Sequence, residues 1–240
     1  MSMKVFEYQL KKSIKRKTVA IKVHNKKVTV YAPQFVSNKH IQEWLFDKQV
    51  WVNAQLTKQH NIADSRQNPL KDKQILIFDS IINIEFKQGT KSEVLNCNDS
   101  LLITHSSRVK NTSQKYQQLL EEYLKEQLTA YIEMRLAYFC AQMGEELPTS
   151  LKVAIYKRKW GSCNSKRELT FNLHLIGAPY HAIDYVIVHE LAHLRHLNHS
   201  KAFWQHVEHF FPNYKASSTW LKKNSMSLQW VFCKRLANHT

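Results

Sequence analysis

The first hundred residues alternate between apolar and polar positions, a pattern typical of half-buried strands. Residues 17–31 alternate between apolar and polar side chains on both sides of a polar Asn-Lys-Lys segment. This pattern predicts a β-hairpin. Residues 74–88 and 93–107 are rich in apolar and β-branched side chains and predict further strands. Before them, residues 39–59 repeat apolar positions every three to four residues, which predicts one amphipathic helix.

Helical spacing dominates the second half of the chain. Apolar residues recur at this spacing from Thr112 to Gly144, and Gly144 is a suitable left-handed C-cap. The segments that follow are shorter, and Pro179 and Pro212 mark boundaries between them. They predict strands at 151–160 and 169–177 with a turn at 161–169, and helices at 181–197, 200–211 and 213–225.

These elements together predict an α+β fold. The chain of 240 residues is long enough for one or two domains with a sizeable core. We expect residues 1–106 to form a β-rich N-terminal region with one helix, and residues 107–240 to form a second domain around the later helices.

The balance of charge is strongly basic, with 35 Lys and Arg against 19 Asp and Glu and a net charge of +16. Such a field attracts polyanions such as nucleic acid, nucleotides or acidic surfaces, although it also serves solubility alone. No nucleic-acid motif is visible, so nucleic-acid association is an expectation from charge only. The early basic run has no aromatic residue within it and consists of Lys11, Lys12, Lys15, Arg16, Lys17, Lys22, Lys26 and Lys27.

The sequence predicts a cytoplasmic protein without a membrane partner. No apolar run reaches the roughly 18 residues of a membrane span, and the N-terminus lacks the apolar core of a signal peptide. The four cysteines, Cys97, Cys140, Cys163 and Cys233, are scattered without a Cys-x-x-Cys pair. In the cytosol they would stay reduced, so a disulfide frame or a thiolate zinc site is not expected.

The strongest chemical signal is the H-E-x-x-H motif of His189, Glu190 and His193. Histidines at positions i and i+4 lie on one face of a helix, one turn apart, so both imidazoles can bind one Zn²⁺ at about 2.1 Å. Glu190 follows the first histidine and can reach a zinc-bound water. The motif therefore predicts a zinc-activated water with Glu190 as its general base.

The residues around the motif indicate that it is a metal site and not a chance match. Residues 186–194 are largely apolar apart from the motif itself, so the helix is expected to be buried. Two histidines and a glutamate inside a buried helix cost several kcal/mol unless they have partners. A metal ion supplies such a partner. The alternative is a pair of core histidines satisfied by hydrogen bonds.

Helix geometry decides between candidates for a third ligand. His196 lies on the same face as His189, but seven residues of helix separate them by about 10 Å. Ligand atoms of one zinc ion lie within roughly 3.5 Å of each other. The third ligand must therefore follow a chain reversal, and Asn198 tolerates the left-handed conformation that ends a helix. We expect His199 to be the third ligand and His196 to be a neighbour.

The strands before the motif indicate which kinds of substrate the site could bind. The edge of a strand at 151–160 or 169–177 could align a peptide by main-chain hydrogen bonds. Arg158, Lys159 and Arg167 would make the neighbourhood cationic, which suits an anionic substrate or intermediate. A solvated basic hairpin is the alternative interpretation of the same residues.

The segment from Lys157 to Trp220 strongly resembles the YgjP-like metallopeptidase-domain family. Two positions differ mildly from the family pattern: the asparagine precedes a leucine by one place, and Lys159 stands where arginine is common. Neither departure touches the H-E-x-x-H motif. The matching positions are Trp160 to Cys163, Asn172-Leu173, Ala178-Pro179, Tyr185-Val186, His189 to Leu194, and Asn198 to Trp204.

This resemblance implies a zincin-like α+β catalytic core and a metallopeptidase activity. By the family motif, His189, His193 and His199 map to zinc ligands and Glu190 to the catalytic acid and base. The chain is also distantly similar to metalloproteases of the WLM and SprT type. They share an H-E-x-x-H helix and a following histidine.

We therefore expect a zinc-dependent hydrolase, most simply a metallopeptidase acting on a peptide or protein substrate. One alternative keeps the metal and changes the substrate, giving a nucleotide pyrophosphohydrolase that hydrolyses nucleoside triphosphates. Another is a nucleic-acid-associated module with structural zinc, which requires a closed set of four ligands.

Overall fold

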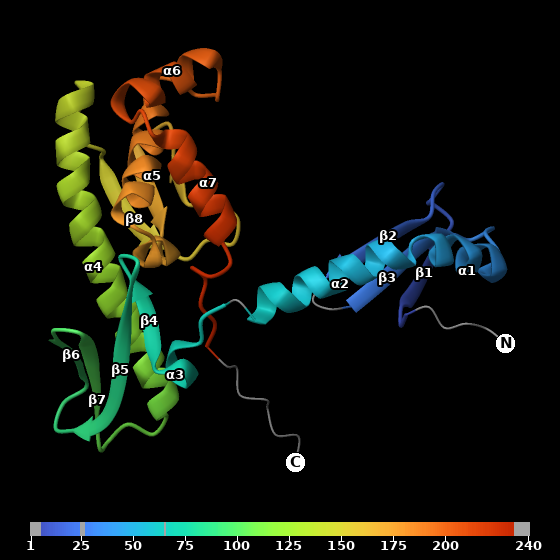
Figure 1. The fold of residues 1–240 in the computed structure, drawn as a ribbon, viewed down its shortest axis with the longest axis horizontal. Helices are drawn as coiled ribbons and strands as arrows, with labels where there is room; N and C mark the ends of the chain where they lie inside the picture. Colours follow the sequence, from blue (N-terminus) through green and yellow to red (C-terminus); the bar gives the residue numbers. More distant parts are fainter. Residues whose placement is uncertain (1–5, 25–26, 65, 233–240) are drawn as a thin grey trace. The chain divides into compact units, whose positions relative to one another are not determined.

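The computed structural model describes residues 6–24, 27–64 and 66–232, without the side chains of 24 and 58–64. It divides the chain into two compact units, Met1–Ser65 (unit 1) and Arg66–Thr240 (unit 2). Sheets and long helices alternate irregularly along the chain (Figure 1), which confirms the predicted α+β class. Cys233 lies outside the described residues. Within them, no helix combines the length and apolarity needed to cross a bilayer.

Unit 1 is built on a three-stranded sheet in the order β1-β3-β2. The predicted hairpin is confirmed as β2 paired antiparallel with β3, in a register that places Val23 opposite Val28. The other neighbour of β3 is β1, which runs parallel to it. The strands are β1 (Gln9–Ser13), β2 (Ala20–His24) and β3 (Lys27–Pro33).

The helix predicted at 39–59 is two helices, α1 (Asn38–Asp47) and α2 (Gln49–Asp64). The break lies at Lys48, whose backbone angles (φ −93°, ψ 0°) leave the helical region. The amide of Val52 still donates to the carbonyl of Lys48 at 2.9 Å. The apolar period therefore continues through the break, which is why the sequence pattern predicts one helix.

A four-stranded sheet begins unit 2, in the order β4-β5-β7-β6, with β5 parallel to β7. Each of the two predicted strand segments is in fact a hairpin. The first turns at Phe78 and Asp79 (φ 48° and 65°), and the second turns beside Asn98 (φ 58°). Two successive positive φ angles match the twist of a tight hairpin. The strands are β4 (Gln74–Ile77), β5 (Ser80–Gly89), β6 (Glu93–Cys97) and β7 (Ser100–Ser106).

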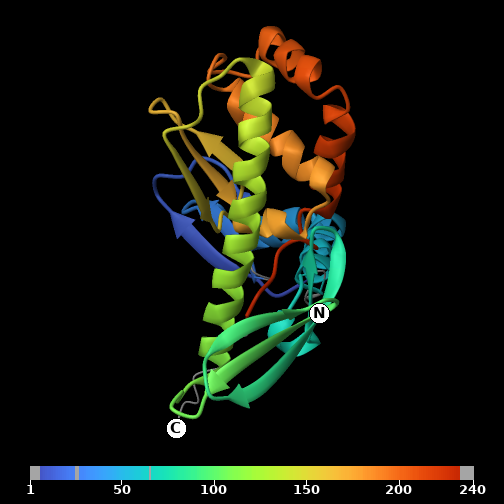
Figure 2. The same cartoon turned by 90° about the vertical axis from the view of Figure 1, so that its left-hand side faces the viewer.

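The long helix α4 (Thr112–Met143) joins the two halves of unit 2 (Figure 2). Gly144 ends it with φ 63°, as the sequence predicts. The helix packs against β7 near its start and against β8 and the H-E-x-x-H helix farther along. Ile84 and Ile103 of the four-stranded sheet share one hydrophobic core with it. The predicted boundary at 106 therefore differs from the division at Ser65, because this sheet packs with the domain that follows it.

A second sheet of unit 2 lies beside the H-E-x-x-H helix, in the order β8-β10-β9. The strand predicted at 151–160 ends at Ala154, and the segment predicted as a turn at 161–169 contains β9. The strand predicted at 169–177 ends at Asn172, whose side chain accepts a hydrogen bond from the His174 amide at 3.2 Å and caps a 3₁₀ helix. The elements are β8 (Ser150–Ala154), β9 (Gly161–Cys163), β10 (Glu168–Asn172) and η1 (Leu173–Gly177).

Four further helices complete unit 2. The H-E-x-x-H helix starts directly after Pro179 and is buried along most of its length. The next begins at Ser200, whose hydroxyl accepts from the Phe203 amide at 3.4 Å, as predicted for an N-cap. The helices are α3 (Pro69–Asp72), α5 (Tyr180–Ala192), α6 (Lys201–Phe210) and α7 (Tyr214–Asn224).

Acid should destabilise the fold through His174 in η1. The side chain is buried against Trp230, with ring centroids 4.3 Å apart. Burial, with a smaller contribution from Arg66, lowers the pKa of His174 from 6.5 to about 4. The folded state therefore binds fewer protons than the unfolded state, and stability is lost as the pH falls from about 6.5 to about 4, by up to about 3 kcal/mol.

Denaturant unfolding at several pH values tests this expectation. His174→Phe keeps a ring against Trp230 and removes the titrating group, so it should reduce the loss of stability in this pH range by up to about 3 kcal/mol. His209→Gln, at an exposed position of α6, should leave the pH dependence as in the unmodified chain. An unchanged pH dependence in His174→Phe would exclude His174 as its source.

Candidate metal centre

Helix α5 places the first two motif residues at the edge of the core. Val186, Ile187 and Val188 are buried beneath it, and this anchors the helix on α4 and the core. His189 is half-buried, while Glu190 is only 5% exposed. A buried carboxyl on a helix is costly unless it has partners, and Glu190 has the positive charge of Lys159 and the backbone of Cys163.

The structure brings together the three predicted histidines. One ring nitrogen from each of His189, His193 and His199 lies within 4.8 Å of the others. The Nε2 atoms of His189 and His199 are 3.0 Å apart. The Nδ1 of His193 lies 3.0 Å from the carbonyl oxygen of His196 and can donate to it, which leaves the Nε2 of His193 as a free acceptor.

The chain reverses earlier than the sequence predicts. Helix α5 ends at Ala192, with His193 as its C-cap, and not at Leu197. Asn198 has no positive φ, so the predicted left-handed C-cap at this residue is wrong. His199 nevertheless returns to His189, because the turn begins at His193. The ring of His196 packs against His206, at a centroid distance of 5.3 Å, and lies outside the triad.

Aromatic rings hold His199 in place although its position is exposed. Trp204 stacks on the imidazole at 5.6 Å with an interplanar angle of 23°, and Tyr214 stacks on Trp204 at 5.3 Å and 19°. Phe203 is fully buried and contacts all three histidine rings at 4.7 to 5.0 Å. These contacts orient the rings before any ion binds.

The three side chains fit a divalent metal. Neutral imidazole is the ligand form, and burial with the neighbouring histidines lowers the pKa of His189 to about 3. Burial and His193 also lower the pKa of His199. The 3.0 Å separation of two Nε2 atoms is close to the roughly 3.4 Å expected between ligand atoms of a tetrahedral zinc ion. Within 6–24, 27–64 and 66–232, no fourth His, Cys, Asp or Glu joins the group.

A pocket of about 520 Å³ opens in front of the triad. Strand β9 and the residues on either side of it form one wall, and α5 forms the other. Glu190 and Lys159 both face this space. The residues that line the pocket are Lys159 to Ser165, Tyr185, Val186, His189, Glu190, His193, Leu197 and His199.

The carboxyl of Glu190 is tuned by its surroundings. Burial raises its pKa to about 7, and the positive charge of Lys159 and a hydrogen bond from the Cys163 backbone partly oppose that rise. A carboxyl with a pKa near neutrality can both accept and return a proton. Burial, a charge partner and a position in a pocket are together typical of a catalytic acid or base.

Gly161 makes room for this carboxyl. A Cβ at Gly161 would lie 2.6 Å from Oε1 of Glu190 and 2.7 Å from its Cγ, closer than atoms of real structures approach. Any side chain at this position would therefore require Glu190 or strand β9 to shift. The sequence pattern Trp-Gly-Ser-Cys contained this residue, but spacing alone gave it no role.

Asn172 fixes the loop that carries Lys159. Its buried side chain donates to the carbonyl oxygens of Tyr156 and Lys159 at 3.0 and 2.9 Å. It accepts from the amides of Tyr156 and His174 at 3.4 and 3.2 Å. All hydrogen-bonding groups of this amide are thus used, and the loop is held against the end of β10.

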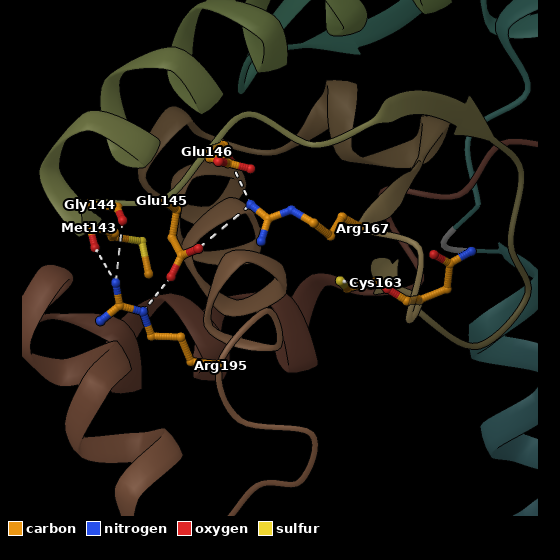
Figure 3. A network of polar contacts seen from close by, with 8 residues as sticks. Met143, Gly144, Glu145, Glu146, Cys163, Arg167 and Arg195 are labelled. Carbon is orange, nitrogen blue, oxygen red and sulfur yellow. Dashed lines mark hydrogen bonds and ion pairs between the residues drawn. The ribbon is translucent and has the colours of Figure 1, made fainter.

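Figure 3 shows a charged network that ties the turn after α5 to the end of α4. Glu145 lies between Arg167, at 3.6 Å, and Arg195, with which it forms a closer ion pair. Arg195 also donates to the carbonyl oxygens of Met143 and Gly144 at 3.1 and 3.4 Å. Because Arg195 stands in the turn between the second and third histidines, this network positions that turn.

Arg195→Gln should therefore weaken metal binding without removing a ligand. Changes to residues that orient metal ligands typically cost 10- to 100-fold in affinity, and we expect about tenfold. Competition with a chromophoric chelator measures the affinity. Lys201→Gln removes the same charge from an exposed position at the start of α6 and should change the affinity less than about twofold. Equal affinities for the two variants would show that the network does not position the turn.

The site consists of three imidazoles on a helix and the turn after it, beside a buried glutamate and an open pocket. This arrangement is that of the metal-dependent hydrolases with an H-E-x-x-H helix. The family model described as YgjP-like, metallopeptidase domain, matches residues 17–224 and thus covers most of both units. The chain therefore belongs to the YgjP-like metallopeptidase-domain family, and the resemblance seen in its sequence is confirmed.

The solved structures include one similar chain, the metallopeptidase zymogen of Pyrococcus abyssi abylysin. It is 23% identical, with a TM-score of 0.37, over 42% of this chain and 99% of that chain. A likeness this partial supports no further conclusion about the site. No curated protein shows significant sequence similarity to the chain.

Proposed function

We propose that this protein is a zinc-dependent peptidase in which His189, His193 and His199 hold the metal and Glu190 is the general base. The observation that supports this most is the convergence of three ring nitrogens within 4.8 Å, at a pocket that also exposes a buried glutamate to substrate. Three imidazoles suit zinc, and a site with three protein ligands keeps one position for chemistry.

When bound, zinc would supply an acidified water and a Lewis acid for the scissile carbonyl. Side chains of the protein would carry out the remaining steps, which are proton transfer and stabilisation of charge. Glu190, with its pKa near 7, would accept the proton of the attacking water and return it to the leaving amine. Lys159, on the pocket wall, would favour negative charge that develops on the substrate.

Strand β9 supports a peptide as the substrate. It is an edge strand, paired with β10 on one side, and it lines the pocket beside the histidines. An extended peptide could add to its free edge through main-chain hydrogen bonds. A nucleoside triphosphate remains the alternative substrate, because Lys159 would also favour phosphate. The structural-zinc alternative is disfavoured, since no fourth ligand joins the triad within the described residues.

His199→Ala should remove both metal and activity. It deletes one of three ligands, so we expect the zinc content after dialysis to fall well below one ion per chain. Cleavage of a peptide library should fall at least about 100-fold. His209→Ala, an exposed histidine in the same unit, is the matched control and should retain both.

The same preparations should be assayed in parallel on nucleoside triphosphates. Zinc-dependent peptide cleavage that is lost in His199→Ala supports the proposal. Unchanged zinc in that variant would refute His199 as a ligand. Zinc-dependent hydrolysis of nucleotides alone would keep the metal site and refute the peptidase.

A further inference from the structure

In the described part of unit 1, a helix covers one face of the sheet, and the other face, called the open face below, carries exposed side chains. On the covered face, the buried side chains of Val30 and Ala32 pack with Ile41 and Leu45 of α1. Side chains alternate between the two faces of a strand. The residues between these positions, such as Tyr31, therefore point to the opposite side.

Positive charge gathers on this open face. Lys11 pairs with Tyr31 across β1 and β3, and Lys22 pairs with Thr29 across β2 and β3. Lys27 belongs to the same face, because it precedes Thr29 by two residues in β3. All three lysines are exposed. The basic sheet face is defined here as Lys11, Arg16, Lys22, Lys27 and Tyr31.

Arg16 completes this face. Its guanidinium lies over the ring of Tyr31, 4.7 Å from the centroid. The turn that carries it is closed by a hydrogen bond from its amide to the Ser13 carbonyl oxygen at 3.4 Å. The basic run of the sequence contains no aromatic residue, but the sheet register places Tyr31 among its side chains.

Net charge is concentrated in this unit. Residues 1–65 contain 12 Lys and Arg and 4 Asp and Glu, which gives +8, half of the +16 of the whole chain. Two of the four acids, Glu43 and Asp47, lie on α1, the helix that packs on the covered face. The open face is thus complementary to a polyanion.

Exposed apolar side chains stand at one end of the sheet. Strands β1 and β3 run parallel and end together, with Ser13 opposite Pro33. Ile14 directly follows β1 and Phe35 is the second residue after β3, and they are 89% and 81% exposed. An exposed aromatic ring can stack on a base, and so can a guanidinium plane.

From these observations we infer that the basic sheet face binds single-stranded nucleic acid, with phosphates on the lysines and bases on Phe35 and the Arg16–Tyr31 stack. Unpaired bases suit an open sheet with aromatic side chains, as on other sheet platforms that bind two or three bases. An anionic membrane would also meet the lysines. The charges, however, extend along the strands, whereas the apolar residues Ile14 and Phe35 occupy one end only. The inference is independent of the proposed hydrolysis.

Two charge-matched double variants of the full chain test the site. Fluorescence anisotropy with labelled oligo-dT and oligo-rU of 12 nucleotides, over a range of salt concentrations, measures binding. Lys11→Gln/Lys22→Gln should weaken binding at least about tenfold and lower the salt slope by about 1.4, or 0.7 for each phosphate contact. Lys39→Gln/Lys48→Gln, on or next to α1, removes the same charge and should weaken binding less than about threefold.

A third variant tests base stacking. Phe35→Ser changes an exposed side chain, so the fold should be kept, and it should weaken oligonucleotide binding at least about fivefold while leaving heparin binding unchanged. Equal weakening by the two double variants would overturn the site, and full binding by Phe35→Ser would overturn stacking at that residue. Binding to phosphatidylserine vesicles without binding to either oligonucleotide would assign the face to membranes instead.

Discussion

Glu190→Gln should retain the metal and lose peptide hydrolysis. The substitution keeps the size of the side chain, and its amide oxygen can still accept from the Cys163 backbone. It removes the group that we propose accepts the proton. General bases typically contribute 10²- to 10⁴-fold to the rate, so we expect kcat to fall by about 10³-fold. The three histidines are untouched, and the zinc content should stay as in the unmodified chain.

The control for this variant is Glu208→Gln, the same chemical change at an exposed glutamate of α6. It should keep both zinc and turnover. Measuring kcat, KM and zinc content for the two variants separates loss of chemistry from loss of fold. If Glu190→Gln kept more than a tenth of the unmodified kcat, Glu190 would not be the general base.

Spacing along one helix made the first part of the site predictable. His189 and His193 are four residues apart, so local geometry places them on one face of the helix, with Glu190 directly after the first of them. The argument that a third ligand must follow a chain reversal uses only the rise of a helix. It assumes that the helix continues to His196, whereas α5 ends at Ala192, but the residue that it selects, His199, lies beside the other two histidines.

The end of the helix was not predictable from the same local pattern. Leu194 and Leu197 continue the apolar period of α5 and predict helix up to Leu197. In the structure Leu197 is 90% exposed, and the chain has already turned at His193. The turn is held by Arg195, whose partners at and just after the end of α4 lie about fifty residues earlier in the sequence. A periodicity argument cannot detect a contact of that separation.

The ends of the strands were predicted wrongly for the same reason. The apolar pattern of 151–160 continues to Ile155 and Tyr156, but the strand stops at Ala154. There the side chain of Asn172 hydrogen-bonds the peptide groups of Tyr156, and the chain turns to form the pocket wall. The hairpin turns were missed because each apolar segment contains its own turn residues, at Asp79 and Asn98. Both are residue types that tolerate a positive φ, so this signal was present in the sequence.

Gly161→Ala should impair catalysis by displacing Glu190. The added methyl group would overlap both Oε1 and Cγ of that side chain. The carboxyl is only 5% exposed, so to avoid the methyl group it must shift into the pocket or displace β9 or α5. A misplacement of about 1 Å in a catalytic group costs on the order of 10²-fold, and we expect a loss of this size in kcat. Zinc affinity should change only a few-fold, because Gly161 supplies none of the three metal ligands.

A double-mutant cycle identifies the cause of that loss. In the unmodified chain, overpacking by Gly161→Ala should lower the free energy of unfolding by about 1–3 kcal/mol. In a Glu190→Ala background, the atoms that the methyl group would meet are gone, so the same change should cost close to nothing. Gly89→Ala, in β5 of the other sheet, should cost the same in both backgrounds, since its neighbour is Thr104 and not Glu190. Additive effects of Gly161→Ala and Glu190→Ala would show that the glycine is needed for some property of β9 itself. Non-additive effects would establish that it is there to leave space for the catalytic carboxyl.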